Sequence, residues 1–394
     1  MSDPRYTPLR ERHEALGASF TDFGGWQMPV RYTSDLAEHH AVRQSAGLFD
    51  ISHMAEFLVT GPYAAEFLDY ALAGRISTMP VGKAKYSLVL AESGGIVDDV
   101  IAYRLAEDRY LVIANAGNRG FVDAAFASRV RSFPSIPERE LPPRGADEDR
   151  SFAGFIGDRG VDVEDVSDSY ALLAVQGPAA EAIVSVAKGI TDLGTPWAEQ
   201  KYYAWADAFF LGEPLLIART GYTGEDGFEL LVRAADAPAL WDALIVAGES
   251  HGLVPAGLAA RDTLRLEAGM PLYGHELTLD TKPAQAGLRR VVAVDKESFV
   301  GKDAVDAAAD APILVGLTAE GKRAGRAGYA VVAEDGTVLG EITSGALSPT
   351  LGHPIAMAYV TPSSAEEGST VFLDVRGTKI PATVTALPFY RRTK

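Results

Sequence analysis

A pair of adjacent carboxylates, Asp98 and Asp99, is the clearest candidate for chemistry in this sequence. Two glycines precede the pair and permit a tight turn, and an apolar run follows it. If this run is a strand, Asp99 shares a face with Ile101 and Tyr103, and Asp98 shares the other face with Val100. Because burying an unpaired charge is costly, an acid on an apolar face indicates a functional group. The alternative is a solvated turn before an ordinary strand, and these residues alone leave both interpretations open.

A second acid and two arginines lie in apolar surroundings further along the chain. Glu229 has an apolar residue on each side in a strand-like run. Arg261 and Arg265 are four residues apart in a predicted helix, so they lie on one face. Two arginines so placed suit an anionic carboxylate, which they can bind bidentately. Internal ion pairing with Asp262 or Glu267 explains them equally well.

The histidines and the glycine-rich segment favour structural interpretations. His39 and His40 are helical neighbours and do not share a face, so we expect no metal pair there. His53 could titrate near neutral pH, but a hydrogen-bonded structural histidine is the more common case. The glycines of 220–227 lack the G-x-G-x-x-G spacing and do not open a helix, which excludes a dinucleotide-binding motif.

Composition limits the classes of function. The 394 residues are 47% hydrophobic and 23% charged, which is ordinary for a globular protein of two or three domains. There is no cysteine, which excludes disulfides, thiol nucleophiles and thiolate metal sites. The net charge of −17 argues against nucleic-acid binding but allows a local basic pocket. No apolar run approaches the roughly 18 residues of a membrane span, and the N-terminus carries no apolar signal segment. We expect a cytoplasmic protein with no membrane partner.

The pattern of predicted elements changes twice along the chain. Prolines and charges in 132–150 predict a loop or linker. From about residue 312, short β-rich runs alternate with turns, which predicts a separate C-terminal β-barrel or sandwich. These runs are 313–317, 329–333, 340–344, 355–360, 370–375 and 380–384.

Several motifs occur together over nearly the whole chain and in the order typical of one family. They are 22–29, 49–54, 94–99, 219–229, 257–269 with 272–274, and 342–352. With these motifs the chain resembles the T-protein of the glycine cleavage system, the folate-dependent aminomethyltransferase. The resemblance implies an α+β fold of three domains in a cloverleaf around a central folate site. The expected domains are 1–53 plus 151–260, a discontinuous folate-binding domain; 54–150, which carries the catalytic aspartate; 261–310, a connecting segment; and 311–394, a C-terminal β-barrel.

The resemblance also implies a reaction and its residues. Such an enzyme takes an aminomethyl group from the lipoyl arm of H-protein, transfers the carbon to the co-substrate tetrahydrofolate, and releases ammonia; it uses no metal. Asp99 matches the catalytic aspartate, Glu229 the acid that binds the pterin ring, and Arg261 an arginine of the folate site. The other positions that match the family's pocket are Met54, Tyr86, Ile101, Tyr103, Asn115, Tyr222 and Tyr273. Arg391 is expected at the glutamate tail of the ligand or at the partner protein.

Three other functions keep part of this resemblance. A tetrahydrofolate-dependent demethylase of a small methylated amine or sulfonium compound would use the same folate site with another donor. A folate-binding protein that assists iron–sulfur proteins would carry a cysteine motif, which is absent here. An inactive folate-binding module would be expected to lose the acid at position 99. H-protein docking requires a basic patch on this acidic chain, and Arg289, Arg290 and the C-terminal tail are the candidates.

Overall fold

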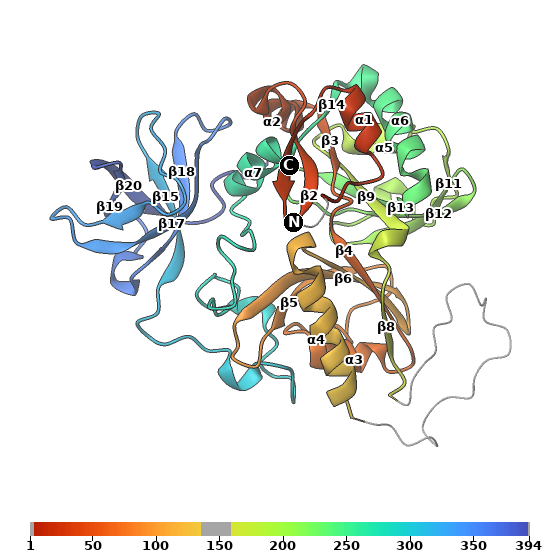
Figure 1. Cartoon of the computed structure of the whole chain (residues 1–394), viewed down its shortest axis with the longest axis horizontal. Helices are drawn as coiled ribbons and strands as arrows, with labels where there is room; N and C mark the ends of the chain where they lie inside the picture. Colours follow the sequence, from red (N-terminus) through yellow and green to blue (C-terminus); the bar gives the residue numbers. More distant parts are fainter. Residues whose placement is uncertain (1–3, 135–158, 393–394) are drawn as a thin grey trace.

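The computed structural model describes residues 4–134 and 159–392, and these form two large sheets, a two-stranded hairpin and a closed barrel (Figure 1). Of the predicted linker 132–150, residues 135–150 lie outside the described residues. The N-terminal part contains α1 (Arg10–Ala15), a hairpin of β1 (Ser19–Phe23) and β2 (Trp26–Arg31), and α2 (Asp35–Gln44). Ser34 begins α2 as its N-cap and accepts a hydrogen bond from the Ala37 amide, which satisfies a free backbone donor of the first turn.

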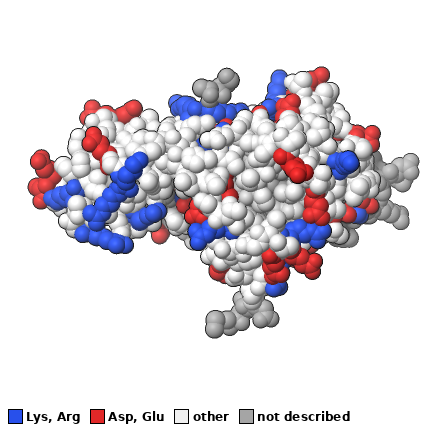
Figure 2. Space-filling model, turned by 90° about the horizontal axis from the view of Figure 1, so that it is seen from above, with Lys and Arg blue, Asp and Glu red and all other residues white. Residues whose placement is uncertain are grey.

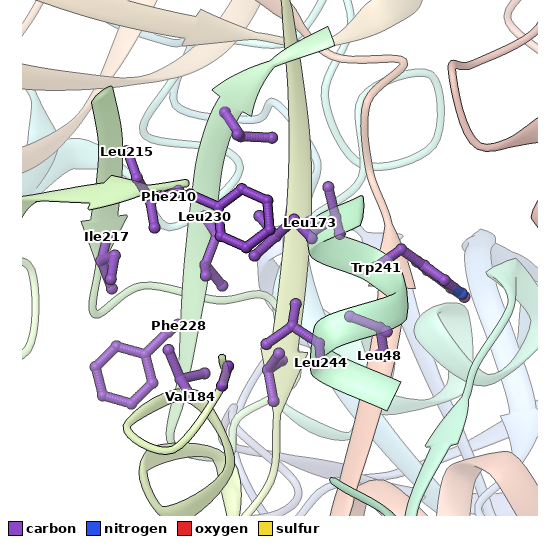
Figure 3. Close-up of a cluster of buried hydrophobic side chains, with 14 of the residues drawn as sticks. Leu48, Leu173, Val184, Phe210, Leu215, Ile217, Phe228, Leu230, Trp241 and Leu244 are labelled. Atoms are coloured by element: carbon purple, nitrogen blue, oxygen red, sulfur yellow. The ribbon is translucent and has the colours of Figure 1, made fainter. Parts of the chain in front are cut away.

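The first sheet has seven strands in the order β10-β11-β12-β13-β9-β3-β14. Their bounds, in that order, are Ile190–Thr191, Trp205–Phe210, Glu213–Ala218, Gly227–Arg233, Tyr170–Gln176, Ala46–Asp50 and Leu253–Pro255. Helices α5 (Ala180–Val184) and α6 (Ala237–Gly248) cover one face. Trp241 and Leu244 of α6 pack there against Leu48 and Leu173 of the sheet (Figure 3). Burying these apolar side chains between helix and sheet supplies most of the stability of such a layer.

The second sheet has five strands in the order β5-β6-β7-β4-β8. Their bounds, in that order, are Ala84–Leu90, Ile96–Ala106, Arg109–Ala114, Ala55–Thr60 and Asp162–Asp165. Helices α3 (Ala64–Ala71) and α4 (Arg119–Ser132) pack on one face of it, against Val100 and Ala102 among others. The predicted alternation along β6 is therefore confirmed, because Ile101 and Tyr103 belong to a different cluster on the opposite face.

The uncovered faces of the two sheets meet each other. One buried cluster joins Phe49, Leu172 and Leu231 of the seven-stranded sheet to Leu58 and Leu111 of the five-stranded sheet. The sheets thus pack face to face, with a helix layer outside each. Residues 151–260 contribute to both sheets, because β8 pairs with β4 while β9–β13 belong to the other sheet, so the expected two-part first domain stays a prediction.

The C-terminal region forms the predicted barrel, a closed ring in the order β15-β18-β17-β16-β19-β20. The bounds from β15 to β20 are Ile313–Ala319, Ala330–Val332, Val338–Leu347, Pro354–Val360, Thr370–Val375 and Thr378–Thr385. Pairing of β15 with β20 closes the ring, which removes open edges. Helix α7 (Leu258–Glu267) lies between the barrel and the two sheets (Figure 1), and it contacts α2 on one side and β17 and β18 on the other.

Candidate functional site

A cavity of about 290 Å³ lies between the two sheets and the segment that follows α7. All the residues that the sequence predicted for the site line this cavity except Arg391; they are Met54, Tyr86, Asp99, Ile101, Tyr103, Asn115, Tyr222, Glu229, Arg261 and Tyr273. Strands β5, β6 and β13 carry five of them, which are Tyr86, Asp99, Ile101, Tyr103 and Glu229, and Asn115 directly follows β7, so the sheets fix the position of these side chains. A concave, mainly apolar space with a few polar groups is typical of a small-molecule site.

Asp99 projects from β6 into the cavity and is held by two donors. Its Oδ2 accepts a hydrogen bond of 3.1 Å from the Tyr86 hydroxyl, and its Oδ1 accepts one of 2.9 Å from the Asn115 side-chain amide. Burial raises the pKa of Asp99 to about 6, against the lowering effect of both donors. The carboxyl group can therefore be charged at neutral pH and still take up a proton under mildly acidic conditions.

Glu229 lies on β13 and is buried with one oxygen engaged. Its Oε2 accepts hydrogen bonds from the Thr220 hydroxyl at 2.5 Å and from the Tyr103 hydroxyl at 3.5 Å. Among the described residues, no hydrogen bond reaches Oε1, so this oxygen is available to a ligand. Burial raises the pKa of Glu229, and the nearby Arg261 guanidinium opposes that effect.

The two arginines of α7 have different surroundings. Arg265 is buried and bonds Asp262, Glu276 and the Ser344 hydroxyl of the barrel. Arg261 faces the cavity, with its guanidinium 4.7 Å from the centre of the Tyr222 ring. In the part of the chain that the structure describes, Arg261 forms no ion pair. The internal-pairing interpretation is thus correct for Arg265, and only Arg261 is placed to bind an anion.

The cavity also contains residues that sequence reasoning did not assign to it. His53 lines it with its Nδ1 buried and without a hydrogen-bond partner among the described residues, which contradicts the hydrogen-bonded structural role that we favoured. Burial and the Arg261 charge lower the pKa of His53 to about 4, so the imidazole is neutral. Phe23 packs edge-on against this ring at 5.4 Å, and both residues lie within motifs named above, which was the available signal. Tyr203, whose φ is 57°, also lines the cavity, but it lies outside the motifs named above, so the sequence did not indicate it.

Arg391 is exposed and lies outside the cavity wall. Its neighbour Arg392 forms an ion pair of 3.3 Å with Asp226, and the Tyr390 ring stacks under the guanidinium of Arg43. The C-terminal segment is thus fixed against the seven-stranded sheet and α2. A contact between Arg391 and a ligand tail stays a prediction.

Comparison with known families identifies the chain. Residues 9–296 match the GCVT N-terminal domain, and residues 313–391 match the glycine cleavage T-protein C-terminal barrel domain. The chain belongs to the glycine cleavage T-protein family. It is 52% identical to the aminomethyltransferase of Saccharopolyspora erythraea and 53% identical to that of Cutibacterium acnes, with 100% of each chain covered. The crystal structure of the glycine cleavage system aminomethyltransferase T of Bartonella henselae is 37% identical, covers 99% of both chains and superposes with a TM-score of 0.83.

The α+β fold with its C-terminal barrel is thus that of the family, and the chain is an enzyme, an aminomethyltransferase. In the described ranges, no group of three or more His, Asp or Glu side chains is arranged to hold a metal ion. Within the same ranges, no helix has the length and apolar character that crossing a membrane requires.

Proposed function

We propose that the chain transfers the methylene carbon of an aminomethyl group, carried on the dihydrolipoyl arm of H-protein, to tetrahydrofolate, with release of ammonia and formation of 5,10-methylenetetrahydrofolate. One observation carries the proposal: Asp99, Glu229 and Arg261, which are far apart in the sequence, line one cavity. Each offers a group that one of the two substrates would need: Asp99 a negative charge, Glu229 a free acceptor oxygen and Arg261 a guanidinium without an ion pair among the described residues.

The cavity residues fit a folate. A pterin ring presents adjacent N–H donors, and the free Oε1 of Glu229 can accept from them. The glutamate tail is anionic, and Arg261 offers a guanidinium for it. The rings of Tyr86, Tyr103 and Tyr222 provide apolar surface for an aromatic heterocycle.

Asp99 supplies negative charge where the reaction needs it. Breaking the bond between carbon and sulfur in the N–C–S unit develops positive charge on the carbon and nitrogen, and a fixed carboxylate stabilises that charge. Tyr86 and Asn115 hold the Asp99 carboxylate in one orientation, which favours alignment of the two substrates. Because the pKa of Asp99 is about 6, the same group can also carry a proton during the transfer.

The lipoylated H-protein would dock through local positive charge, because the chain as a whole is acidic. Figure 2 shows basic side chains gathered over the barrel end of the molecule, and Arg289 and Arg290 form a second exposed basic site. Contacts between exposed charges weaken when salt screens them. The Michaelis constant for H-protein should therefore rise steeply with ionic strength, and docking that is insensitive to salt would contradict this part of the proposal.

Calorimetric titration with tetrahydrofolate tests the site directly. We expect wild-type binding in the micromolar range and weaker binding by Glu229→Gln and Arg261→Ala. Loss of a charge-assisted hydrogen bond is worth about 1.5–3 kcal/mol, or roughly a 10- to 100-fold rise in Kd. Arg233→Ala is the matched control, because among the described residues Arg233 pairs with Glu213 and Asp236 at the surface, away from the cavity. Absence of wild-type binding would overturn the proposal.

The donor is tested separately with a transfer assay. Aminomethylated H-protein is compared with methylated amines and sulfonium compounds as the source of the one-carbon unit. Transfer from H-protein supports the proposal. Transfer only from a small methylated compound would make the chain a demethylase.

A further inference from the structure

Behind the cavity wall, the carboxylate of Asp98 accepts three hydrogen bonds, one more than the carboxylate of Asp99. Asp98 lies on the opposite face of β6 and is fully buried. Its Oδ1 accepts from the side-chain amides of Asn118 at 2.7 Å and Asn115 at 2.8 Å, and its Oδ2 accepts from the Asn115 backbone N–H at 2.9 Å. Asp98 does not line the cavity, so it has no direct contact with a ligand there.

One side-chain amide connects the two acids. Besides its bond to Asp98, the Asn115 Nδ2 donates to Asp99 Oδ1 at 2.9 Å and lies 3.3 Å from the Asp99 carbonyl oxygen. An asparagine amide has two N–H groups, and here one serves each carboxylate. A flip of this amide would place its oxygen against two acids, so the orientation of Asn115 is fixed. Asn115 precedes the short turn η1 (Ala116–Asn118), which also carries Asn118.

We propose that Asp98 is a positioning residue for the transfer reaction: it holds the Asn115 amide in one orientation, and that amide directs the Asp99 carboxylate into the cavity. The inference rests on the proposed function of Asp99 and extends it to a residue outside the site. Asp98 also places a second carboxylate beside Asp99, which makes Asp99 a better proton acceptor than a lone acid would be.

The charges around the pair support this arrangement. Burial and the repulsion of Asp99 raise the pKa of Asp98 to about 7, and burial raises that of Asp99 to about 6. The two carboxyl groups titrate as a pair, so each keeps its proton to a higher pH beside the other than it would alone. The other titratable groups that face Asp99 are phenols whose own pKa values burial raises, so they are uncharged at neutral pH; they are Tyr86, Tyr203, Tyr222 and Tyr273. Among these groups, Asp98 is the one that titrates in the same pH range as Asp99.

Two substitutions should shift the pH dependence of activity in opposite directions. In Asp98→Asn, one carboxylate oxygen becomes an NH₂ group, which cannot accept a hydrogen bond. The lost acceptor is the partner either of the Asn115 backbone N–H or of the Asn115 and Asn118 side-chain amides. The negative charge beside Asp99 is also lost. We expect kcat to fall about tenfold, because small misplacements of a catalytic group have large effects on rate. The KM for tetrahydrofolate should stay within about twofold, because Asp98 does not reach the cavity. The acid limb of the kcat profile should move to lower pH.

In Asn115→Ala, both carboxylates lose amide donors that lower their pKa, so the acid limb should move to higher pH. The control is Asp165→Asn, which removes a hydrogen-bonded carboxylate of the same sheet that contacts Arg119 and Ser167 but neither acid of the pair. A general loss of stability would affect all three variants without moving the limb in opposite directions.

An unchanged kcat together with an unchanged acid limb in Asp98→Asn would overturn the inference. If this variant does not fold, an unshifted limb in Asn115→Ala overturns it. The titration of the Asp99 carboxyl carbon, followed by NMR on protein labelled with ¹³C-aspartate, gives a readout that needs no turnover. If the wild type is inactive, the proposed function fails, and the inference is then decided by whether this titration moves to lower pH in Asp98→Asn.

Discussion

Replacing Glu267 by glutamine should loosen the barrel from the two sheets. Glu267 ends α7, and its carboxylate accepts hydrogen bonds from Arg43 of α2 at 2.8 Å, from the Ser348 hydroxyl at 2.5 Å and from the Thr350 hydroxyl at 2.7 Å. His39 lies 3.3 Å away on the same helix as Arg43. One buried carboxylate therefore connects α2, α7 and the loop after β17. Glutamine keeps the shape of the side chain but cannot accept at both oxygens.

The magnitude follows from the pKa of this group. Burial alone would raise the pKa of Glu267, but the hydrogen bonds from His39, Ser348 and Arg43 outweigh it and lower the pKa from 4.5 to about 2. A carboxyl group whose pKa is lower in the folded state than in the unfolded state stabilises the fold at pH values above its unfolded pKa. This contribution is lost as the pH falls through its folded pKa. With about 1.4 kcal/mol per unit, the ionised group contributes about 3 kcal/mol near pH 7 and about 1 kcal/mol near pH 3.

Urea denaturation of wild type and Glu267→Gln, followed by tryptophan fluorescence near pH 7 and near pH 3, measures this difference. The two proteins should differ by about 3 kcal/mol in unfolding free energy at the higher pH and by about 1 kcal/mol at the lower pH. The matched control is Glu14→Gln, because Glu14 forms an exposed i,i+4 pair with Arg10 and should contribute little. A destabilisation that is equal at both pH values would refute the reasoning.

Three further substitutions probe other parts of the fold. Glu56 is buried with neither carboxyl oxygen hydrogen-bonded among the described residues, and burial raises its pKa; Glu56→Met should therefore stabilise the protein by about 1–3 kcal/mol, with a gain that grows as pH rises above 4.5, and a pH-independent urea midpoint difference would count against this. A Cβ on Gly95 would lie 1.6 Å from the Leu279 carbonyl oxygen, so Gly95→Ala should lower Tm and unfolding free energy by about 2 kcal/mol or more, whereas Gly120→Ala, in open space on a helix, should not. Arg265→Lys should cost about 2 kcal/mol in chemical denaturation, because lysine cannot reproduce the fork that binds a carboxylate and a hydroxyl together; an unchanged midpoint would contradict that role.

Local periodicity was sufficient to predict which side chains of a single strand share a face. The β6 alternation placed Asp99, Ile101 and Tyr103 on one face because the side-chain period of a strand is two residues. The six C-terminal runs became the six barrel strands because each is a short β-rich run bounded by turn residues. Their closure into a ring, however, depends on the pairing of β15 with β20, which no local pattern specifies.

Contacts between distant segments could not be predicted in this way. The i,i+4 spacing put Arg261 and Arg265 on one helix face, but only the packing of the barrel decided that Arg265 is internally paired and Arg261 faces the cavity. Likewise, the strand period placed Asp98 and Asp99 on opposite faces of β6, but it did not predict which side chains bind each carboxylate. The segment from Asn115 to Asn118 gives the two acids different hydrogen-bond partners, and no local pattern indicates that this segment packs against β6.

Helix α7 belongs both to the cavity wall and to the contact with the barrel, and this affects how sequence variants should be interpreted. Arg261 faces the cavity near the start of the helix, while Arg265 and Glu267, near its end, are bonded to Ser344 and Ser348 of the barrel. No described barrel residue lines the cavity itself. A replacement of Ser348 would nevertheless shift the helix that presents the guanidinium. If the cavity binds folate as proposed, a screen of natural variants would score such a change as a folate-affinity defect, although the altered side chain lies outside the cavity.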